Sequence, residues 1–375
     1  IHLKAQSMTQ RVLILGGRGR IGSQVTHDLL THTDAQIVIT GTARSPHWEN
    51  PFPSSRVSFA AIALADEDAL RQAIATADLV IHCVGPFHHR DQSVLTLCIE
   101  QGVNYLDVSD NLGFTRKVLS CDAAATERGV TAIVNSGIFP GISNSMARQG
   151  VEQFEQPQTI HISYVVGGSG GAGLTVLRTT FLGLLHPLQA WVDAQWQSVQ
   201  PYSDRQAVDF PAPFHRAHVY WYEMPETATL AETFPVHTVV TKFGSVPDLY
   251  NHLTWLTARL MPKAWLQHPP VLEALSQISY RMTQVSDRFS GTGVAICCEV
   301  TGNRQGQPTR YRATLVHPDT AAAAGSGTGS IAELMLSGKL HKPGVSTVEA
   351  AIPTSWFEAA MQRRNIHIEQ HIEPL

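Results

Sequence analysis

The sequence has little charge and no excess of positive charge. Its 375 residues carry 27 Lys and Arg against 31 Asp and Glu, which gives a formal net charge of −4. Charged residues make up only 15% of the chain, whereas a protein that binds nucleic acid usually needs a basic surface to displace counterions. We therefore expect no nucleic-acid partner. The apolar content of 43% also excludes a disordered chain.

Cysteine is scarce, and several diagnostic patterns are missing. The five cysteines include no Cys-x-x-Cys pair, which is typical of reduced thiols in a cytoplasmic protein. No apolar run approaches the roughly 18 residues of a membrane-spanning helix, and none near the start resembles a signal peptide. The sequence holds no His-Glu-x-x-His and no Tyr-x-x-x-Lys. We expect a cytoplasmic protein with no metal site, no transmembrane segment and no short-chain-dehydrogenase mechanism.

The first part of the chain alternates between strand-like and helix-like segments. Short apolar runs begin at Arg11, Gln36, Val57, Ala77, Val103 and Val130, and amphipathic stretches separate most of them, including one over 115–128. Alternation of this kind predicts an α/β fold, a Rossmann-type doubly wound parallel sheet with helices on both faces. We assign residues 8–137 to this dinucleotide-binding domain.

After Gly137 the regular alternation of strand-like and helix-like segments ends. We expect an α+β substrate or dimerisation domain over 138–350. Apolar helical stretches are predicted over 174–196, 249–265 and 271–282, with strands over 237–243, 294–300 and 311–316. The proline-rich segment 201–214 reads as an extended surface connection. Residues 351–375 are predicted to pack back on the fold.

The strongest motif is the sequence Gly-Arg-Gly-Arg-Ile-Gly over 17–22, which fits G-x-G-x-x-G. It follows a predicted strand and opens a predicted helix, which is the context that dinucleotide binding requires. Gly17 allows a tight turn, Gly19 lets the backbone approach a diphosphate, and Gly22 lets the helix pack closely on the strand. The positive end of the helix then attracts the phosphate charge. An ordinary strand–turn–helix connection is the alternative.

The end of the second strand distinguishes between the two nicotinamide cofactors. An enzyme that uses NAD usually places Asp or Glu about 20 residues after the glycine turn, to bind the ribose 2′-hydroxyl. Here the strand runs into Thr-Gly-Thr-Ala-Arg-Ser, with no acidic residue. Arg44 and Ser45 are suited to a 2′-phosphate, with Arg18 or Arg20 adding charge. This favours NADP, although Arg44 as a solvated loop charge remains open.

Two further loops follow strands at the same predicted edge of the sheet. Cys83, Val84, Gly85 and Pro86 follow the fourth strand, where the backbone would pass close to the nicotinamide ribose, because ligands bind beyond the carboxyl ends of such strands. The fifth strand ends in Asp-Val-Ser-Asp over 107–110. One of these carboxylates has an alternative role as a helix cap.

These segments together resemble a known family. GGRGRIG, DLVIHCVGPF, GVNYLDVSD and NSGIFPGISNSMA occur in the order and spacing of saccharopine dehydrogenase-like proteins, of the saccharopine reductase branch. The segment 167–175, GGSGGAGLT, is similar to a glycine-rich turn in their second domain. The resemblance implies an NADP-binding Rossmann domain, an α+β domain, a homodimer and an active site between the domains. It also implies hydride transfer at a C=N or C=O carbon.

The resemblance and the positions of the residues in the predicted fold together assign residues to the cofactor and to the substrate. The residues assigned to cofactor binding are Gly17, Gly19, Arg20, Ile21, Gly22, Arg44, Ser45, Cys83, Val84, Gly85 and Pro86. The substrate cleft falls to Phe87, His88, Ser109, Asp110, Pro140, Gly141 and Arg178. His88 is suited to proton transfer, although an ordinary loop role is the alternative. No residue is assigned as catalytic.

Two segments keep more than one interpretation. GSGTGS over 325–330 precedes a predicted helix over 331–336, so it is either an anion-binding turn or a flexible helix start. The apolar segment 255–266 is a buried helix, a dimer interface, a substrate wall or a membrane-facing patch.

The sequence therefore predicts an NADP-dependent oxidoreductase that acts on a small amino-acid- or polyamine-derived substrate. The alternatives are a reductase of a hydrophobic, lipid-like substrate and a non-catalytic NADP-binding protein. The scarcity of arginines near the second-half motifs argues against a substrate as acidic as saccharopine.

Overall fold

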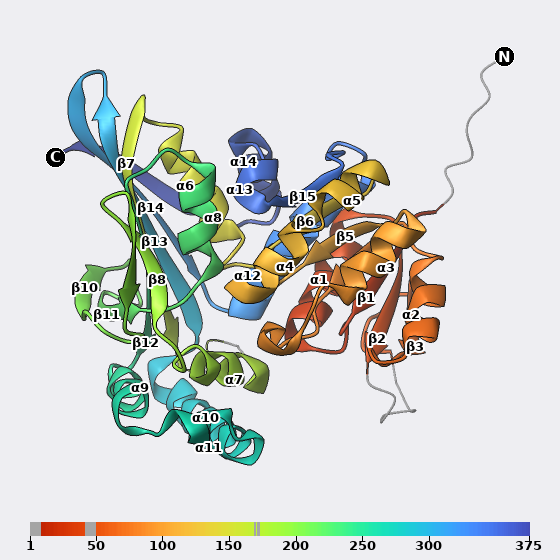
Figure 1. Ribbon diagram of the computed structural model, residues 1–375, viewed down its shortest axis with the longest axis horizontal. Helices are drawn as coiled ribbons and strands as arrows, with labels where there is room; N and C mark the ends of the chain where they lie inside the picture. The colour runs from red at the N-terminus through yellow and green to blue at the C-terminus, as the bar shows by residue number, and fades with distance from the viewer. Residues whose placement is uncertain (1–8, 42–49, 169, 171–172) are drawn as a thin grey trace.

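A computed structural model describes residues 9–41, 50–168, 170 and 173–375. Two β-sheets, each with its own helices, stand side by side (Figure 1). The chain forms the first sheet, crosses to the second, and then returns to both.

The first sheet has seven strands in the order β15-β6-β5-β4-β1-β2-β3, and every pairing in it is parallel. Its strands are β1 (Arg11–Leu15), β2 (Gln36–Gly41), β3 (Val57–Ala61), β4 (Leu79–His82), β5 (Asn104–Asp107), β6 (Thr131–Val134) and β15 (Gly344–Thr347). From β1 the chain builds β2 and β3 on one side and then crosses to β4 on the other. Because the strand order reverses there, the carboxyl ends of β1 and β4 border the crevice where such folds bind ligands. The predicted fold class is correct.

Helices cover both faces of this sheet, as the alternation of buried side chains requires. The helices associated with it are α1 (Arg20–His32), α2 (Glu67–Ile74), η1 (Phe87–His89), α3 (Ser93–Gln101), α4 (Leu112–Leu119), α5 (Asp122–Glu127) and α12 (Thr320–Leu336). Val12 and Ile14 face the core that holds α1 and α12, whereas Leu13 and Leu15 face α2, α3 and α4. The single helix predicted over 115–128 is two helices, since the chain turns between Ser120 and Cys121.

The second sheet has nine strands, and its main path runs β10-β11-β12-β7-β13-β14-β16, with β8 and β9 attached at β12. Its strands are β7 (Gln156–Gly167), β8 (Leu188–Val192), β9 (Gln195–Val199), β10 (Gln206–Asp209), β11 (Arg216–Trp221), β12 (Thr238–Val246), β13 (Gly293–Arg304), β14 (Gln307–His317) and β16 (Ile368–Pro374). Only the pair of β12 with β7 is parallel. The remaining helices are α6 (Ile142–Val151), α7 (Leu174–Leu182), α8 (Pro225–Thr233), α9 (Leu249–Leu260), α10 (Lys263–Gln267), α11 (Pro269–Ser290), α13 (Val348–Ala351) and α14 (Thr354–Arg363).

Two predicted segments of this half are wrong. The helix predicted over 174–196 ends at Leu182, and β8 and β9 follow as a hairpin. The hairpin turns at Asp193 and Ala194, which both have positive φ (52° and 58°), and a helix cannot continue through that conformation. The connection predicted over 201–214 contains β10, which pairs with β11.

The segment GSGTGS is neither a turn nor an anion site, because it lies inside α12 and is almost wholly buried. Its glycines allow α12 to pack closely against α1. A Cβ at Gly325 would lie 2.6 Å from Cβ of Gln24, and one at Gly329 would lie 2.1 Å from Oδ1 of Asp28. The amides of this segment donate hydrogen bonds within the helix, so they are not available to bind an anion.

The C-terminal part of the chain joins both sheets. β15 pairs with β6 in the first sheet, although it falls within the range 138–350 predicted for the second domain. β16 pairs with β14 in the second sheet. We therefore propose that α12, β15 and α14 belong structurally to the dinucleotide-binding unit, in addition to residues 8–137.

Candidate functional site

The turn after β1 is held closed by close backbone packing. Gly16 has φ +77°, a conformation that favours glycine. A Cβ at Gly17 would lie 2.4 Å from Cβ of Ile39, and one at Gly22 would lie 2.4 Å from the oxygen of Gly16. Any larger side chain at Gly17 or Gly22 would therefore force β1, β2 and α1 apart.

Gly19 is different, because the described part of the chain does not fill the space beside it. A Cβ there would meet only the oxygen of Gly16, at 3.1 Å. The first hydrogen bond within α1 runs from the N–H of Ser23 to the oxygen of Gly19 (2.9 Å), so helix geometry leaves the amides of residues 20–22 pointing out of the helix end. Space beside a glycine and outward amides at a helix start fit the diphosphate of a dinucleotide.

Arg18 lies at the end of β2, where the sequence analysis places the adenosine ribose. A Cβ at Gly41 would lie 2.8 Å from Cδ of Arg18, and the Arg18 guanidinium stands 5.5 Å from the ring centre of Phe59. Its side chain is exposed, so the charge is available to a ligand. Arg44 and Ser45, which were predicted to bind the 2′-phosphate, lie outside the described residues.

The loop over 83–86 follows β4 and borders the same crevice. The N–H of Cys83 donates to the oxygen of Leu15 at 2.9 Å, which continues the pairing of β4 with β1. Nε of Arg90 donates to the oxygen of Val84 at 3.1 Å and fixes the loop. Burial raises the pKa of the Cys83 thiol, which keeps it protonated and unreactive.

The second domain meets the cofactor turn through the start of α7. A Cβ at Gly85 would lie 3.2 Å from Cγ2 of Thr175, and a Cβ at Gly173 would lie 3.2 Å from Cδ of Arg20. The predicted nicotinamide loop and the phosphate turn therefore both face α7. A reaction site at this junction is bounded by both domains.

The predicted substrate residues after β4 and β5 have different surroundings. Phe87 is buried, with its ring 5.2 Å from that of His82 and 4.9 Å from that of Phe114, so it forms core. His88 is half-buried, and burial lowers its pKa to about 4, so it is neutral near pH 7. A neutral imidazole accepts a proton more readily than it donates one.

Ser109 holds two strand ends together and is fully buried. Its N–H and Oγ donate to Oδ1 of Asp107 at 3.0 and 2.6 Å. The same Oδ1 accepts the N–H of Asn135 at 3.0 Å, and Nδ2 of Asn135 donates to Oγ of Ser109 at 2.8 Å. This network fixes the ends of β5 and β6 and thereby positions Asp110.

Asp110 is the predicted residue with a pKa closest to neutral. Burial, assisted by the nearby Asp107 carboxylate, raises its pKa to about 6. Its charge also contributes to raising the pKa values of Tyr164 and Tyr222 in the second domain. Asp110 therefore lies within electrostatic reach of both domains and exchanges its proton near neutral pH.

Pro140 and Gly141 are buried and shape the start of α6. Gly141 has φ +131°, and a Cβ there would lie 2.1 Å from the oxygen of Gly137, so only glycine fits. Its N–H donates to Oδ1 of Asn144 at 2.8 Å. Phe139, just before them, stacks on Tyr164 with ring centres 4.0 Å apart.

Sequence reasoning missed two buried glutamates beside α6. Oγ of Ser143 donates to Glu226 at 2.8 Å, and Nδ2 of Asn144 donates to Glu349 at 2.9 Å. Each glutamate keeps one buried oxygen without a partner, and burial raises the pKa of both, that of Glu226 to about 7. They come from α8 and α13, and no motif in the sequence marks either one.

Arg178 lies on α7 and is paired with a glutamate of α11. Its Nε and Nη2 contact Oε2 of Glu273 on α11 at 2.8 and 2.7 Å, so the guanidinium is already paired. The expectation that Arg178 receives a substrate carboxylate has no support in this arrangement.

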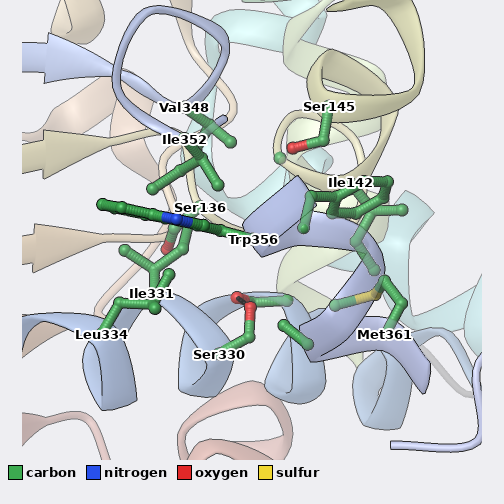
Figure 2. A pocket seen from close by; sticks show the side chains of 14 residues that line it. Ser136, Ile142, Ser145, Ser330, Ile331, Leu334, Val348, Ile352, Trp356 and Met361 are labelled. Atoms are coloured by element: carbon green, nitrogen blue, oxygen red, sulfur yellow. Dashed lines mark hydrogen bonds between the residues drawn. The ribbon is translucent and has the colours of Figure 1, made fainter. Parts of the chain in front are cut away.

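A small cavity lies away from these residues, between α6, α12 and α14. Trp356 lies across it, with Ile331 on one side and Ile352 on the other, and Ser136, Ser145 and Ser330 supply its polar groups (Figure 2). Of the predicted site residues only Gly141 lines it. We assign this cavity to the packing of α14. No group of metal-binding side chains occurs within the described ranges.

Comparison with known proteins identifies the first domain. The family described as the saccharopine dehydrogenase NADP binding domain matches residues 12–133. Residues 12–133 are therefore similar to the NADP-binding domain of saccharopine dehydrogenases. The predicted resemblance to saccharopine dehydrogenase-like proteins and the prediction of NADP as the cofactor are confirmed for this domain.

Two relatives illustrate the extent of the likeness. A probable mitochondrial saccharopine dehydrogenase-like oxidoreductase of Arabidopsis thaliana is 28% identical over 122 residues, which are 28% of this chain and 27% of that protein. The match thus spans about a quarter of that relative. The apo, L-Glu-forming saccharopine dehydrogenase of Saccharomyces cerevisiae is 13% identical, with a TM-score of 0.72 over 97% of this chain and 100% of that one. It shares the fold of both domains.

Proposed function

We propose that this saccharopine dehydrogenase-like protein transfers hydride between NADP(H) and a C=N or C=O carbon at the junction of its domains. The substrate would be a small molecule derived from an amino acid or a polyamine. The supporting observation is that Arg20 and Gly85 of the cofactor domain both lie close to the start of α7, since a Cβ at Gly173 or Gly85 would be 3.2 Å from Arg20 or Thr175. A nicotinamide beside Gly85 is then enclosed between the two domains.

The proposed cofactor residues act by position and charge. When bound, NADPH supplies the hydride. Gly17, Gly19 and Gly22 keep the turn open to the diphosphate, and the amides of Arg20, Ile21 and Gly22 stabilise its charge. Arg18 adds a cation near the 2′-phosphate, together with the predicted Arg44 and Ser45. The loop of Cys83, Val84, Gly85 and Pro86 excludes water from one side of the nicotinamide.

We further propose that Asp110 holds the proton that balances hydride transfer. Its pKa of about 6 leaves it partly protonated near neutral pH, whereas His88, with a pKa of about 4, carries almost no transferable proton there. Phe87, Ser109, Pro140 and Gly141 act around it as positioning residues, since they are buried. Tyr164 and Tyr222 would face the substrate from the second domain.

The experiment that tests the proposal measures NADPH binding and turnover together. Gly19→Asp places a carboxylate where the diphosphate is expected, and it should abolish NADPH fluorescence enhancement. Gly306→Asp adds the same charge in the turn between β13 and β14, where no described atom lies within 4 Å of the added Cβ, and it should bind normally. NADPH binding that is unchanged in Gly19→Asp would overturn the assignment of the turn.

A second candidate function is the reduction of a hydrophobic, lipid-like substrate. Two observations favour it: Arg178 is already paired with Glu273, and the apolar segment 255–266 is largely exposed. Oxidation of NADPH with keto acids and amines would support the first function, and oxidation with long-chain carbonyl compounds would support the second. Binding of NADPH without turnover on either panel would support a non-catalytic NADP-binding protein.

The oligomeric state and the cellular location of the protein are separate proposals. We propose a homodimer in the cytoplasm, which light scattering and cell fractionation would test. No helix in the described part of the chain is long and apolar enough to cross a membrane.

A further inference from the structure

The helices α9, α10 and α11 carry an unusual share of the exposed apolar surface. Of thirteen large apolar side chains that are exposed in the described residues, nine lie between 249 and 285. The exposed apolar residues of α9 recur every three or four residues, and so do those of α11. Each helix therefore presents one apolar face to solvent. They are Leu249, Leu253, Leu256 and Leu260 with Trp255 on α9, Trp265 on α10, and Ile278, Met282 and Val285 on α11.

These helices form one outer end of the second domain (Figure 1). The hydroxyl of Tyr250 on α9 donates to the oxygen of Met282 on α11 at 3.0 Å, so the two helices lie together. Leu260, Val285 and Trp265 are the most exposed of these apolar residues, at 72%, 61% and 59%. A monomer in water gains nothing from such exposure, which indicates that something covers this surface.

The charge of the same helices indicates what covers it. They carry four cations, Arg259, Lys263, Arg281 and Arg288, against Glu273 and Asp287, so the segment is positive within a chain of net charge −4. Glu273 is already paired with Arg178. No ion pair joins any of the four cations to another described residue. The apolar faces are therefore bordered by available positive charge.

We propose that α9, α10 and α11 dock this protein on an anionic lipid surface. Trp and Leu side chains enter the boundary between head groups and acyl chains, while Lys and Arg extend their charges to the lipid phosphates. Each cation near an anionic surface adds to the attraction, and salt weakens it. This inference concerns the location of the protein and goes beyond the proposed reaction.

A second copy of the chain fits this surface less well. A twofold interface places the same patch against itself, so the four cations of each copy would approach those of the other. The buried centre of a protein interface is usually depleted of charge. The lipid surface satisfies the apolar faces and the cations at once.

Docking would also fix the orientation of the reaction site. α11 is joined to α7 by the contact of Glu273 with Arg178, and the start of α7 faces Arg20 and Gly85. The docked surface and the cofactor junction are thus connected through one helix.

The test is flotation of the full chain with vesicles. One set contains equal parts of phosphatidylglycerol and phosphatidylcholine, and the other contains phosphatidylcholine alone. We expect binding to the anionic set, weaker binding to the neutral set, and loss in high salt. The double variant Leu260→Gln/Trp265→Gln should lower the partition coefficient by about tenfold or more, because two large apolar anchors are lost.

Matched controls separate docking from misfolding. Trp196→Gln removes a tryptophan on β9 that is as exposed as Trp255, at 42%, and it should float like the wild type. Lys263→Glu/Arg281→Glu should lose anionic binding, whereas Lys117→Glu on α4 should not. Circular dichroism and NADPH binding show that each variant is folded.

Three results would overturn the proposal. They are no flotation with either set, equal flotation of wild type and Leu260→Gln/Trp265→Gln, and a dimer that this variant converts to monomers without any vesicle binding. The last result would assign the surface to a second copy of the chain. Each is distinguishable from failure of the proposed reaction, because the readout does not depend on turnover.

Discussion

Glu226 offers a direct test of the buried carboxylates beside α6. Its side chain is fully buried, one oxygen accepts from Ser143, and the other has no partner. Burial, together with the nearby charges of Glu349 and Asp110, raises its pKa from 4.5 to about 7. Glu226→Gln keeps the shape and an acceptor for Ser143 while it removes the ability to ionise.

The sign of the effect follows from where the proton is bound. Between about pH 4.5 and 7 the folded state keeps the Glu226 proton while the unfolded state loses it. The stability that protonated Glu226 contributes to the wild type is therefore complete below about pH 4.5, the pKa in the unfolded state. This contribution decreases as the pH rises to about 7. A shift from 4.5 to about 7 corresponds to about 3 kcal/mol in full, of which about 2.5 kcal/mol falls between about pH 5 and about pH 8.

The measurement is urea unfolding of the wild type and Glu226→Gln at about pH 5 and about pH 8. The free energy of unfolding of the variant, relative to the wild type, should rise by about 2.5 kcal/mol from the lower to the higher pH. The amide nitrogen that replaces the unpartnered oxygen imposes a cost, but the same one at both pH values. Glu155→Gln on the surface should show no such change. A variant curve parallel to the wild-type curve would refute a raised pKa at Glu226.

Three further predictions follow from the packing and the cofactor turn. Gly22→Ala should destabilise the fold by about 1–3 kcal/mol and lower NADPH affinity, because its Cβ would lie 2.4 Å from the oxygen of Gly16. Calorimetry measures both quantities, and unchanged values would contradict this packing. Arg18→Ala should weaken NADPH by about 10-fold or more and NADH much less, measured by fluorescence titration; equal losses would exclude a 2′-phosphate contact. Arg364→Met should lower the free energy of unfolding in urea by about 3–5 kcal/mol, because it leaves the buried Asp28 carboxylate without its guanidinium partner. A decrease below about 1 kcal/mol would contradict the importance of that ion pair.

The first domain was predictable from the sequence because its signals are local. The central parallel strands are buried on both faces, so they appear as continuous apolar runs, such as the one over 79–82. The glycine turn is equally local, since Gly17, Gly19 and Gly22 fall within one connection and their roles follow from backbone contact alone.

The helix α12 shows where local signals fail. Its sequence over 325–330 contains three glycines, which on propensity alone indicate a turn. In the fold Gly325 and Gly329 face α1, where a Cβ would collide with Gln24 or Asp28. The loss in helix propensity is offset by close packing with a segment about 300 residues earlier, and no local pattern reveals that partner.

The two buried glutamates beside α6 could not be recognised from the sequence for the same reason. Glu226 and Glu349 resemble ordinary surface glutamates in the sequence, yet they bond Ser143 and Asn144 across separations of 83 and 205 residues. Their raised pKa values come from burial, which only the completed topology creates. Asp110 was found because it follows a recognisable strand end, but its pKa of about 6 depends on the burial that the closed fold produces. A motif therefore locates the cofactor, whereas the protonation states around the substrate are properties of the assembled domains.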